Sequence, residues 1–311
     1  MKNILKPLLI IIILAMLLSL TSCLLTSEFT FELNEDGKSY KLAGAGCGGS
    51  NIFAETITIP STYNGLPVTT IGNNALLLCR NVKHVIIPDS VTTLEDDVFT
   101  FNLSIETIEI PDSVLYIGIG SLPFGDNVLY NQYKDGYYLG NKNNPYHVLA
   151  WVGKQDTKET ITDFEIHSNT KVVHGFGGFD KLTSVTIPDS VISISPHAFS
   201  GCSSIKSVVI GNSVTNIGYN AFMNCDSLES IVIPESVTTI GKEAFADCPS
   251  LTSIVIPATV TTMGRAVFYN RYDYYGPITV YCEAEFKPDG WDDEWDVTGT
   301  SITVIWGYKG E

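Results

Sequence analysis

The segment Gly44–Gly49 reads G-A-G-C-G-G, which matches the G-x-G-x-x-G fingerprint of dinucleotide-binding folds. In those folds the pyrophosphate binds at the N-terminus of the helix that follows the glycines. Residues 50–60, S-N-I-F-A-E-T-I-T-I-P, leave no room for a long helix before their proline. The acidic residue needed about twenty positions later for the ribose is also missing, since none occurs between Glu55 and Asp89. We therefore interpret the segment as a glycine-rich turn, and no nucleotide is expected to bind.

Other residues with catalytic or metal-binding potential are scattered. The histidines stand at positions 84, 147, 167, 174 and 197, and no two of them have the spacing of a metal-ligand motif. Neither a G-x-S-x-G nucleophile elbow nor a P-loop occurs. The densest acidic cluster, W-D-D-E-W-D at 291–296, lacks the residue order of a calcium-binding loop. No enzymatic activity, metal or cofactor is therefore expected.

The charge balance restricts the class of partner. The chain carries 34 acidic and 18 basic residues, a formal net charge of −16. Such a surface repels nucleic acid and anionic lipid headgroups, so neither is expected as the main partner. A basic partner is favoured.

The N-terminal segment 1–22 has the order of a secretory signal peptide. Lys2 and Lys6 precede an uncharged run at 8–18, which is followed by Leu20-Thr21-Ser22-Cys23. The apolar run is shorter than the roughly 20 residues of a spanning helix. L-T-S-C resembles a bacterial lipobox, in which the cysteine is lipidated, although an ordinary signal peptide with an incidental cysteine is the alternative. We expect Cys23 to be lipidated and the exported chain to be held at the surface of the cell envelope by this lipid alone.

The rest of the chain repeats itself. The pentapeptide I-P-D-S-V and its variants I-G-N-S-V, I-P-E-S-V and I-P-A-T-V recur with their second residue at positions 88, 111, 188, 211, 234 and 257. The step within each run is constant, at about 23 residues, a period in the range that indicates a repeat array. Three further columns keep this step: Cys79, Cys202, Cys225 and Cys248, with Asn102 and Phe179 in the same phase; Phe199, Phe222 and Phe245; and Gly218, Gly241 and Gly264. The repeat therefore predicts a solenoid.

One repeat, Cys225–Phe245, predicts the path of a coil. Leu228, Ile231 and Ile233 alternate as a short strand, which Pro234 ends because it has no N–H to donate. Val237 and Ile240 then return to the core, Gly241 permits a tight corner, and residues 243–245 are predicted to form one helical turn. Stacked coils bury one continuous core and place their strands in a parallel ladder.

The cysteine column allows three interpretations. Cysteines one coil apart lie within reach of a disulfide, and a ladder of thiolates could bind metal. A metal site would not accept Phe179, and a buried free cysteine usually packs as a small apolar group. We favour buried structural thiols that meet the backbone groups of the turns.

These units, such as C-D-S-L-E-S-I-V-I-P-E-S-V-T-T-I-G-K-E-A-F, resemble the BspA-type (treponemal-type) leucine-rich repeats of bacterial surface proteins. The resemblance covers residues 56–268 and implies a β-rich repeat solenoid. The expected organisation is a signal peptide (1–22), a lipidated N-terminus and capping hairpin (23–55), repeats (56–114), an irregular insertion (115–165), regular repeats (166–268) and a C-terminal β/Trp cap (269–311). Strands at 29–33 and 38–43 should form the hairpin, and Trp291, Trp295 and Trp306 should cover the last coil.

The middle of the chain departs from the pattern. The interval between positions 111 and 188 equals three steps of the repeat plus a remainder of eight, so the phase is lost between them. We expect coils there, but irregular ones.

The outward positions of the strands are the predicted binding site. Repeat proteins commonly bind through such concave surfaces, and a column of exposed valines would suggest a partner. Resemblance to BspA-type proteins implies adhesion to extracellular-matrix or cell-surface proteins. The alternatives are a structural scaffold of the envelope, or a glycan-binding or hydrolytic surface protein with carboxylates at 120–165. The predicted site residues are Ile86, Thr107, Glu109, Thr186, Ser207, Val209, Ser230, Val232, Ser253 and Val255.

Overall fold

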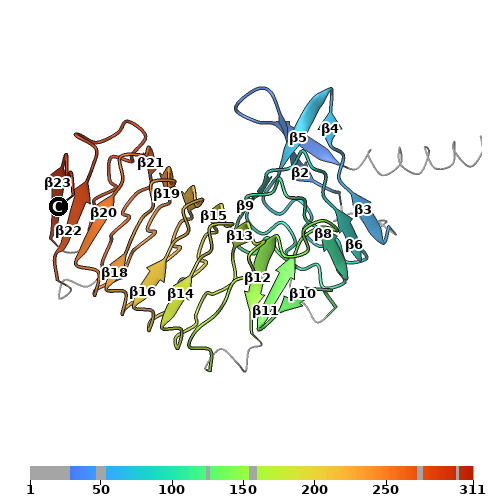
Figure 1. The fold of residues 1–311 in the computed structure, drawn as a ribbon. Helices are drawn as coiled ribbons and strands as arrows, with labels where there is room; N and C mark the ends of the chain where they lie inside the picture. Colours follow the sequence, from blue (N-terminus) through green and yellow to red (C-terminus); the bar gives the residue numbers. More distant parts are fainter. Residues whose placement is uncertain are drawn as a thin grey trace, which may run out of the picture.

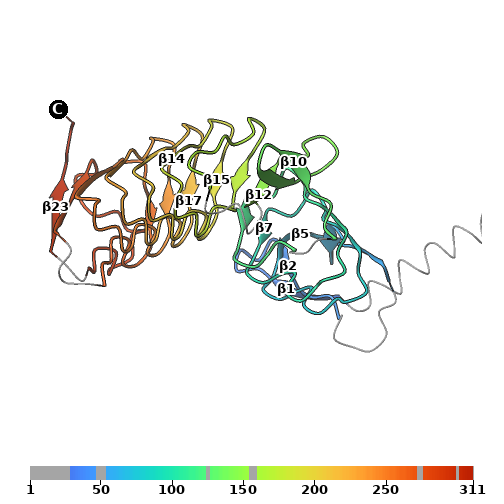
Figure 2. The same ribbon diagram turned by 90° about the horizontal axis from the view of Figure 1, so that it is seen from below.

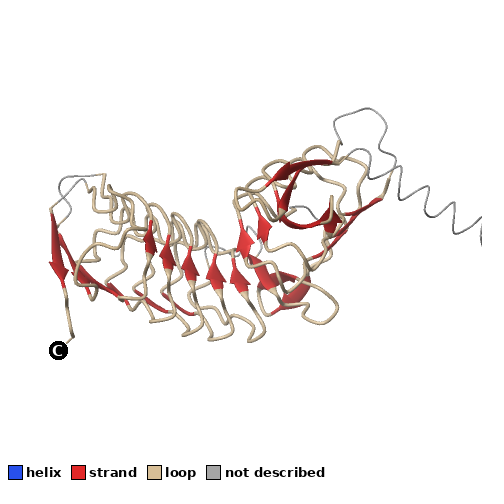
Figure 3. Cartoon of the chain, turned by 90° about the horizontal axis from the view of Figure 1, so that it is seen from above, coloured by secondary structure: helices blue, strands red, loops and turns tan. Residues whose placement is uncertain are grey.

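The fold is taken from a computed structural model that describes residues 29–46, 54–123, 127–153, 160–271, 276–298 and 301–310. These residues form a β-solenoid of about ten turns, and none of them lies in a helix (Figure 3). The predicted solenoid is thereby confirmed. The lipobox, Cys23 and most of the glycine-rich segment lie outside the described residues. Within the described part of the chain, no helix is long and apolar enough to cross a membrane.

Each regular coil contributes two short strands, so the solenoid has two strand rows. The first strand row contains β3 (Thr56–Thr58), β6 (His84–Ile86), β8 (Thr107–Glu109), β14 (Ser184–Thr186), β16 (Ser207–Val209), β18 (Ser230–Ile231), β20 (Ser253–Ile256), β22 (Ile278–Cys282) and β23 (Ile302–Trp306). The second strand row contains β2 (Tyr40–Gly44), β5 (Leu66–Ile71), β7 (Thr93–Leu94), β9 (Tyr116–Ile117), β12 (Val148–Val152), β13 (Val172–Val173), β15 (Ser193–Ile194), β17 (Asn216–Ile217), β19 (Thr239–Ile240) and β21 (Thr262–Met263).

The alternation of apolar residues places one side of each strand in the core. Leu228, Ile231 and Ile233 are buried, as predicted, and so are Val237 and Ile240. The carbonyl of Pro234 accepts a hydrogen bond from the amide of Val237, which closes the turn between the two strands at 3.0 Å. Phenylalanines one coil apart stack along the core of the C-terminal arm, with ring centroids 4.8–5.9 Å apart: Phe176, Phe199, Phe222, Phe245 and Phe268.

The cysteine column bonds each coil to the previous one. The thiol of Cys225 donates a hydrogen bond to the carbonyl of Phe199 at 3.3 Å, and Cys248 does the same to Phe222 at 3.1 Å. The amide of Asn102 reproduces this contact with the carbonyl of Leu76. The buried-thiol interpretation is confirmed for Cys202, Cys225 and Cys248, which are buried and not disulfide-bonded. It is wrong for Cys79, which is disulfide-bonded.

The predicted helical turn at 243–245 is also wrong. Glu243 has a φ of 53°, in the left-handed region, so a right-handed turn cannot include it. The nearby Gly241 is required for a different reason from the one predicted. A Cβ on Gly241 would lie 2.4 Å from the amide nitrogen of Tyr219, so the glycine allows two backbones to approach.

Both ends of the solenoid are capped as predicted. At the N-terminus, β1 (Thr30–Leu33) pairs antiparallel with β2, and β4 (Thr62–Tyr63) pairs with β5. At the C-terminus, Trp291 and Trp295 are buried against the last coil, and the indole N–H of Trp291 donates to the carbonyl of Val260 at 2.9 Å. Trp306 contacts both of the other tryptophans.

The irregular middle consists of coils of unequal length. Glu109 pairs with Gly140, Val148 with Val172 and Glu165 with Thr186, so the coil that starts at Glu109 is the longest of the three. This long coil contains an inserted hairpin, β10 (Asn131–Tyr133) and β11 (Gly136–Leu139), which pairs with β12. The extra residues of the middle region are therefore concentrated in this hairpin.

The hairpin coincides with a bend between two arms, one containing β1–β9 and the other β12–β23 (Figures 1 and 2). The second strand row is interrupted there, because β9 and β12 belong to different sheets. Turns that follow the second strand row form the inner side of the bend. In Figure 1 the arms open upward, whereas β14, β16 and β18 lie along the lower edge. The inner side of the bend and the first strand row are thus different surfaces.

Candidate binding face

We call the outward-pointing side chains of the first strand row the strand face. Parallel pairing aligns them in columns, because Ser184 pairs with Ser207, Ser207 with Ser230 and Thr186 with Val209. On the N-terminal arm, Ile86 pairs with Glu109 in the same way. The predicted site residues are therefore arranged on one row, in two groups that the inserted hairpin separates.

The most apolar part of the strand face is a column of three valines. The exposed fractions of Val209, Val232 and Val255 are 59%, 77% and 37%, and that of Ile86 is 38%. Polar side chains flank these positions. Glu109, Thr186, Ser207, Ser230 and Ser253 are exposed, and Thr107 is half-buried.

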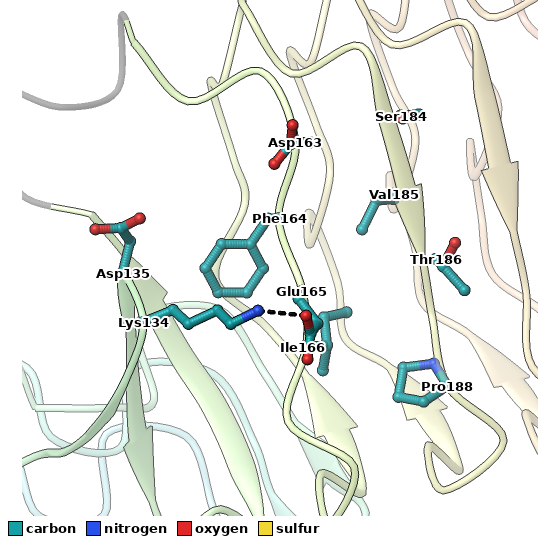
Figure 4. Close-up of a pocket in the computed structure, with 10 residues that line it drawn as sticks. All are labelled: Lys134, Asp135, Asp163, Phe164, Glu165, Ile166, Ser184, Val185, Thr186 and Pro188. Atoms are coloured by element: carbon teal, nitrogen blue, oxygen red, sulfur yellow. Dashed lines mark hydrogen bonds and ion pairs between the residues drawn. The ribbon is translucent and has the colours of Figure 1, made fainter.

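A pocket of about 470 Å³ adjoins this column at Thr186. We call it the hairpin pocket. Its charged side chains are Lys134 and Asp135, from the hairpin loop, and Asp163 and Glu165, from the following coil (Figure 4). Its apolar lining comes from the largely buried Phe164, Ile166 and Val185 together with Pro188.

Glu165 is the best-connected carboxylate of the pocket. The ammonium of Lys134 forms an ion pair with it, and the hydroxyl of Tyr133 donates a hydrogen bond to it at 2.7 Å. These donors, Lys134 first, lower the pKa of Glu165. The carboxyl is therefore ionised at neutral pH and is not a proton donor of the kind that glycoside hydrolysis requires.

A second pocket, of about 440 Å³, lies on the other side of the hairpin. We call it the Asp89 pocket. It is lined by the carboxylates of Asp89, Glu109 and Asp112 and by Lys142. Asp112 accepts a hydrogen bond from the side-chain amide of Asn141 at 2.9 Å. Each pocket thus combines three carboxylates with one ammonium group. In the part of the chain that the structure describes, no group of three or more His, Cys, Asp or Glu side chains could hold a metal ion.

Carboxylates at 120–165 were predicted only for the hydrolytic alternative, and neither the Asp89 pocket nor an apolar patch on the N-terminal arm was predicted. The patch is formed by Leu78, Phe101 and Leu103 around a pocket of about 480 Å³, and Phe101 and Leu103 are 66% and 73% exposed. Leu78 and Phe101 have φ values of 59° and 61°, which are unfavourable for bulky side chains. An alignment of the repeats could have revealed Leu78 and Phe101 as unusual. In other repeats the same position is held by Gly201, Asn224 and Asp247.

The sequence pattern of the BspA-type leucine-rich repeat region matches residues 49–127 and 157–274, in six copies. The matched residues make up more than half of the chain. The chain belongs to the BspA-type leucine-rich repeat family. The gap between the two matched regions, 128–156, contains the inserted hairpin, so the family pattern and the bend agree on where the repeats are interrupted.

Solved structures of bacterial leucine-rich repeat proteins are similar to this BspA-type chain. A leucine-rich repeat protein of T. pallidum is 20% identical over 78% of this chain and 86% of its own, with a TM-score of 0.32. A leucine-rich cell surface protein of Faecalibacterium prausnitzii is 19% identical over 91% and 97%, with a TM-score of 0.42. The pneumococcal vaccine antigen PcpA is 16% identical over 85% and 82%, with a TM-score of 0.43. No curated protein sequence matches the chain.

Proposed function

We propose that this protein is a non-catalytic lipoprotein of the cell envelope that binds other proteins through its strand face. The observation that supports the proposal is the column of Val209, Val232 and Val255. Exposed apolar side chains thus recur at the same outward position on three successive coils, and apolar patches typically mark sites of interaction.

The architecture favours binding by many small contacts. Adjacent coils repeat the same outward positions, so a partner that lies across the row meets serine or threonine beside valine on each regular coil. The scaffold is held by hydrogen bonds between coils, which limits the conformational entropy lost on binding. Matrix or cell-surface proteins are the partners we propose.

Surface attachment through Cys23 belongs to the same proposal. The signal-peptide pattern and the lipobox support it. In a bacterium expressing the full chain, the mature protein should begin with a lipidated Cys23, which mass spectrometry detects. Cys23→Ala should move the protein from the membrane fraction to the soluble fraction, and unchanged fractionation would contradict the lipid anchor.

Two alternatives have specific consequences. A hydrolytic surface protein would have to use Asp135, Asp163 or Glu165, the carboxylates of the hairpin pocket. The lowered pKa of Glu165 argues against this residue as the general acid. A structural scaffold would need no exposed apolar column, and replacing the valines would then leave its role intact.

The proposal is tested by capture. Immobilised residues 24–311 should retain a protein from a mixture of matrix and serum proteins, and a variant with glutamate at 209, 232 and 255 should not. Retention of the same protein by both would show that the strand face is not the binding site.

A further inference from the structure

We propose that the partner presents an extended basic segment to the strand face. Its lysine or arginine side chains would enter the hairpin pocket and the Asp89 pocket, and its apolar side chains would contact the valine column. This inference rests on the proposed function of the same face and specifies the chemistry of its partner.

The hairpin pocket has an excess of negative charge. Lys134 is paired with Glu165, so its ammonium already offsets one of the three carboxylates. Asp135 and Asp163 remain, and neither takes part in any of the ion pairs formed among the described residues. Figure 4 shows Asp135 on the hairpin and Asp163 on the following coil, where it lies next to Phe164. A long cationic side chain fits such a site, since its aliphatic stem packs on apolar surface while its charged head meets the carboxylates.

The Asp89 pocket has the same balance. Its carboxylates, on Asp89, Glu109 and Asp112, face a single ammonium, that of Lys142. His147 lies 3.5 Å from Asp112, but burial lowers the pKa of this histidine, so it adds no positive charge near neutral pH. The net charge of −16 extends the attraction for a cation beyond the pockets themselves.

The spacing of the coils defines the conformation of the segment. Paired strands lie about 4.8 Å apart, so sites two coils apart are separated by about 10 Å. Two coils separate Glu109 from Glu165, two more lead to Val209, and another two to Val255. A polyproline II helix places every third side chain on one face, about 9.3 Å apart. A ten-residue segment in this conformation therefore meets both pockets with its first and fourth side chains and the valine column with its seventh and tenth.

The valine column distinguishes this occupant from a simple polycation. A polyamine or a lysine-rich tail would use the pockets alone, whereas the apolar column continues the same row beyond them. The combination of the two favours a polypeptide with a period of three.

The test uses a fluorescein-labelled decapeptide with arginine at its first and fourth positions, leucine at its seventh and tenth, and proline elsewhere. Fluorescence anisotropy should show saturable binding to residues 24–311. In the double variant Asp135→Asn/Asp163→Asn, Kd should rise about fivefold, as expected when exposed charge pairs are lost. The control variant Asp180→Asn/Asp289→Asn changes the net charge equally, at exposed sites away from the pocket, and should bind like the wild type.

Two control peptides distinguish the contribution of the arginine charges from that of the three-residue spacing. Citrulline in place of arginine keeps the shape but removes the charge, and should abolish saturable binding. A peptide of the same composition without the period of three should bind at least fivefold more weakly. Equal binding of the shuffled peptide, equal weakening by both double variants, or no binding of the periodic peptide would overturn the proposal. The wider function would fail separately, by loss of the protein capture described above.

Discussion

The phenol oxygen of Tyr219 lies 3.3 Å from a carboxylate oxygen of Asp96, although 123 residues separate them in the sequence. Asp96 follows β7 in the N-terminal arm, and Tyr219 follows β17 in the C-terminal arm. Burial, and then the nearby charge of Asp96, raises the pKa of Tyr219. The hydroxyl is therefore protonated at physiological pH and donates to Asp96, which joins the two arms on the inner side of the bend.

Removing this hydroxyl should loosen the bend. Tyr219→Phe keeps the ring but loses the bond, so the free energy of unfolding should fall by about 1 kcal/mol. Small-angle X-ray scattering should show a wider distribution of overall dimensions. Tyr308→Phe, at the C-terminal end of the solenoid, is the matched control and should leave both quantities unchanged. An unaltered scattering curve for Tyr219→Phe would show that other contacts set the bend.

The buried His174 should make stability depend on pH. Burial lowers the pKa of His174 from 6.5 to about 4, so the unfolded chain binds a proton that the folded chain does not. The stabilising effect is complete above pH 6.5 and is lost as the pH falls toward 4, with a slope of at most about 1.4 kcal/mol per pH unit. Among the residues that the structure describes, Nδ1 of His174 has no hydrogen-bond partner, so His174→Gln should fold normally.

Comparing the wild type with His174→Gln separates the effect of His174 on stability from that of other histidines with lowered pKa values, such as His147 and His197. Denaturant titrations between pH 7 and 4 should show a smaller loss of stability in His174→Gln than in the wild type. Parallel curves would contradict the assignment.

The buried thiols should be unreactive in the folded protein. Burial raises the pKa of Cys282 to about 12, and the pKa of Cys225 is also raised, so few thiolates exist at pH 8. Maleimide should label Cys202, Cys225, Cys248 and Cys282 only after unfolding, and Cys79 only after reduction as well. Labelling of Cys79 without a reductant, detected by peptide mass spectrometry, would exclude its disulfide.

The glycine column should tolerate no side chain. In Gly241→Ala the new Cβ would lie 2.4 Å from a backbone nitrogen of the neighbouring coil. Because backbone atoms cannot move aside cheaply, we expect a loss of about 3 kcal/mol in unfolding free energy. Gly276→Ala is a suitable control, since a Cβ there would meet no atom of the described residues within 4 Å. A loss below about 1 kcal/mol at Gly241 would show that the coils can separate.

The regular part of the fold could be predicted because each residue there repeats in its column. The strands around Ile231 and Ile240, the turn at Pro234 and the stacked Phe222 follow from the constant step of the repeat and from burial. The helical turn was predicted wrongly because local propensity favours a helix at Glu243, whereas hydrogen bonds between coils impose a left-handed φ. Cys79 shares the phase of the free thiols, so the repeat gave no sign of its disulfide.

The candidate site was only partly predictable. Exposure of the valine column follows from alternation, because Val209 directly follows the buried Val208 and Val232 directly follows the buried Ile231. The pockets do not follow, since Lys134 and Glu165 lie far apart in the sequence, in a region without a period. Only the path of the inserted hairpin brings them together beside Thr186.

Binding of the partner by the valine column is tested by a matched binding measurement. Surface plasmon resonance would compare the captured partner's Kd for the wild type, for a triple variant with glutamate at 209, 232 and 255, and for a control triple variant. The control carries glutamate at the exposed positions Leu33, Phe286 and Val297, so both variants gain the same charge. Circular dichroism and thermal melting should show all three proteins folded.

We predict a Kd at least a hundredfold higher for the valine variant, since the loss of a few central contacts of about 1–2 kcal/mol each accumulates. The control variant should bind within threefold of the wild type. Equal affinity of both variants, or a loss in the control alone, would contradict binding through the strand face.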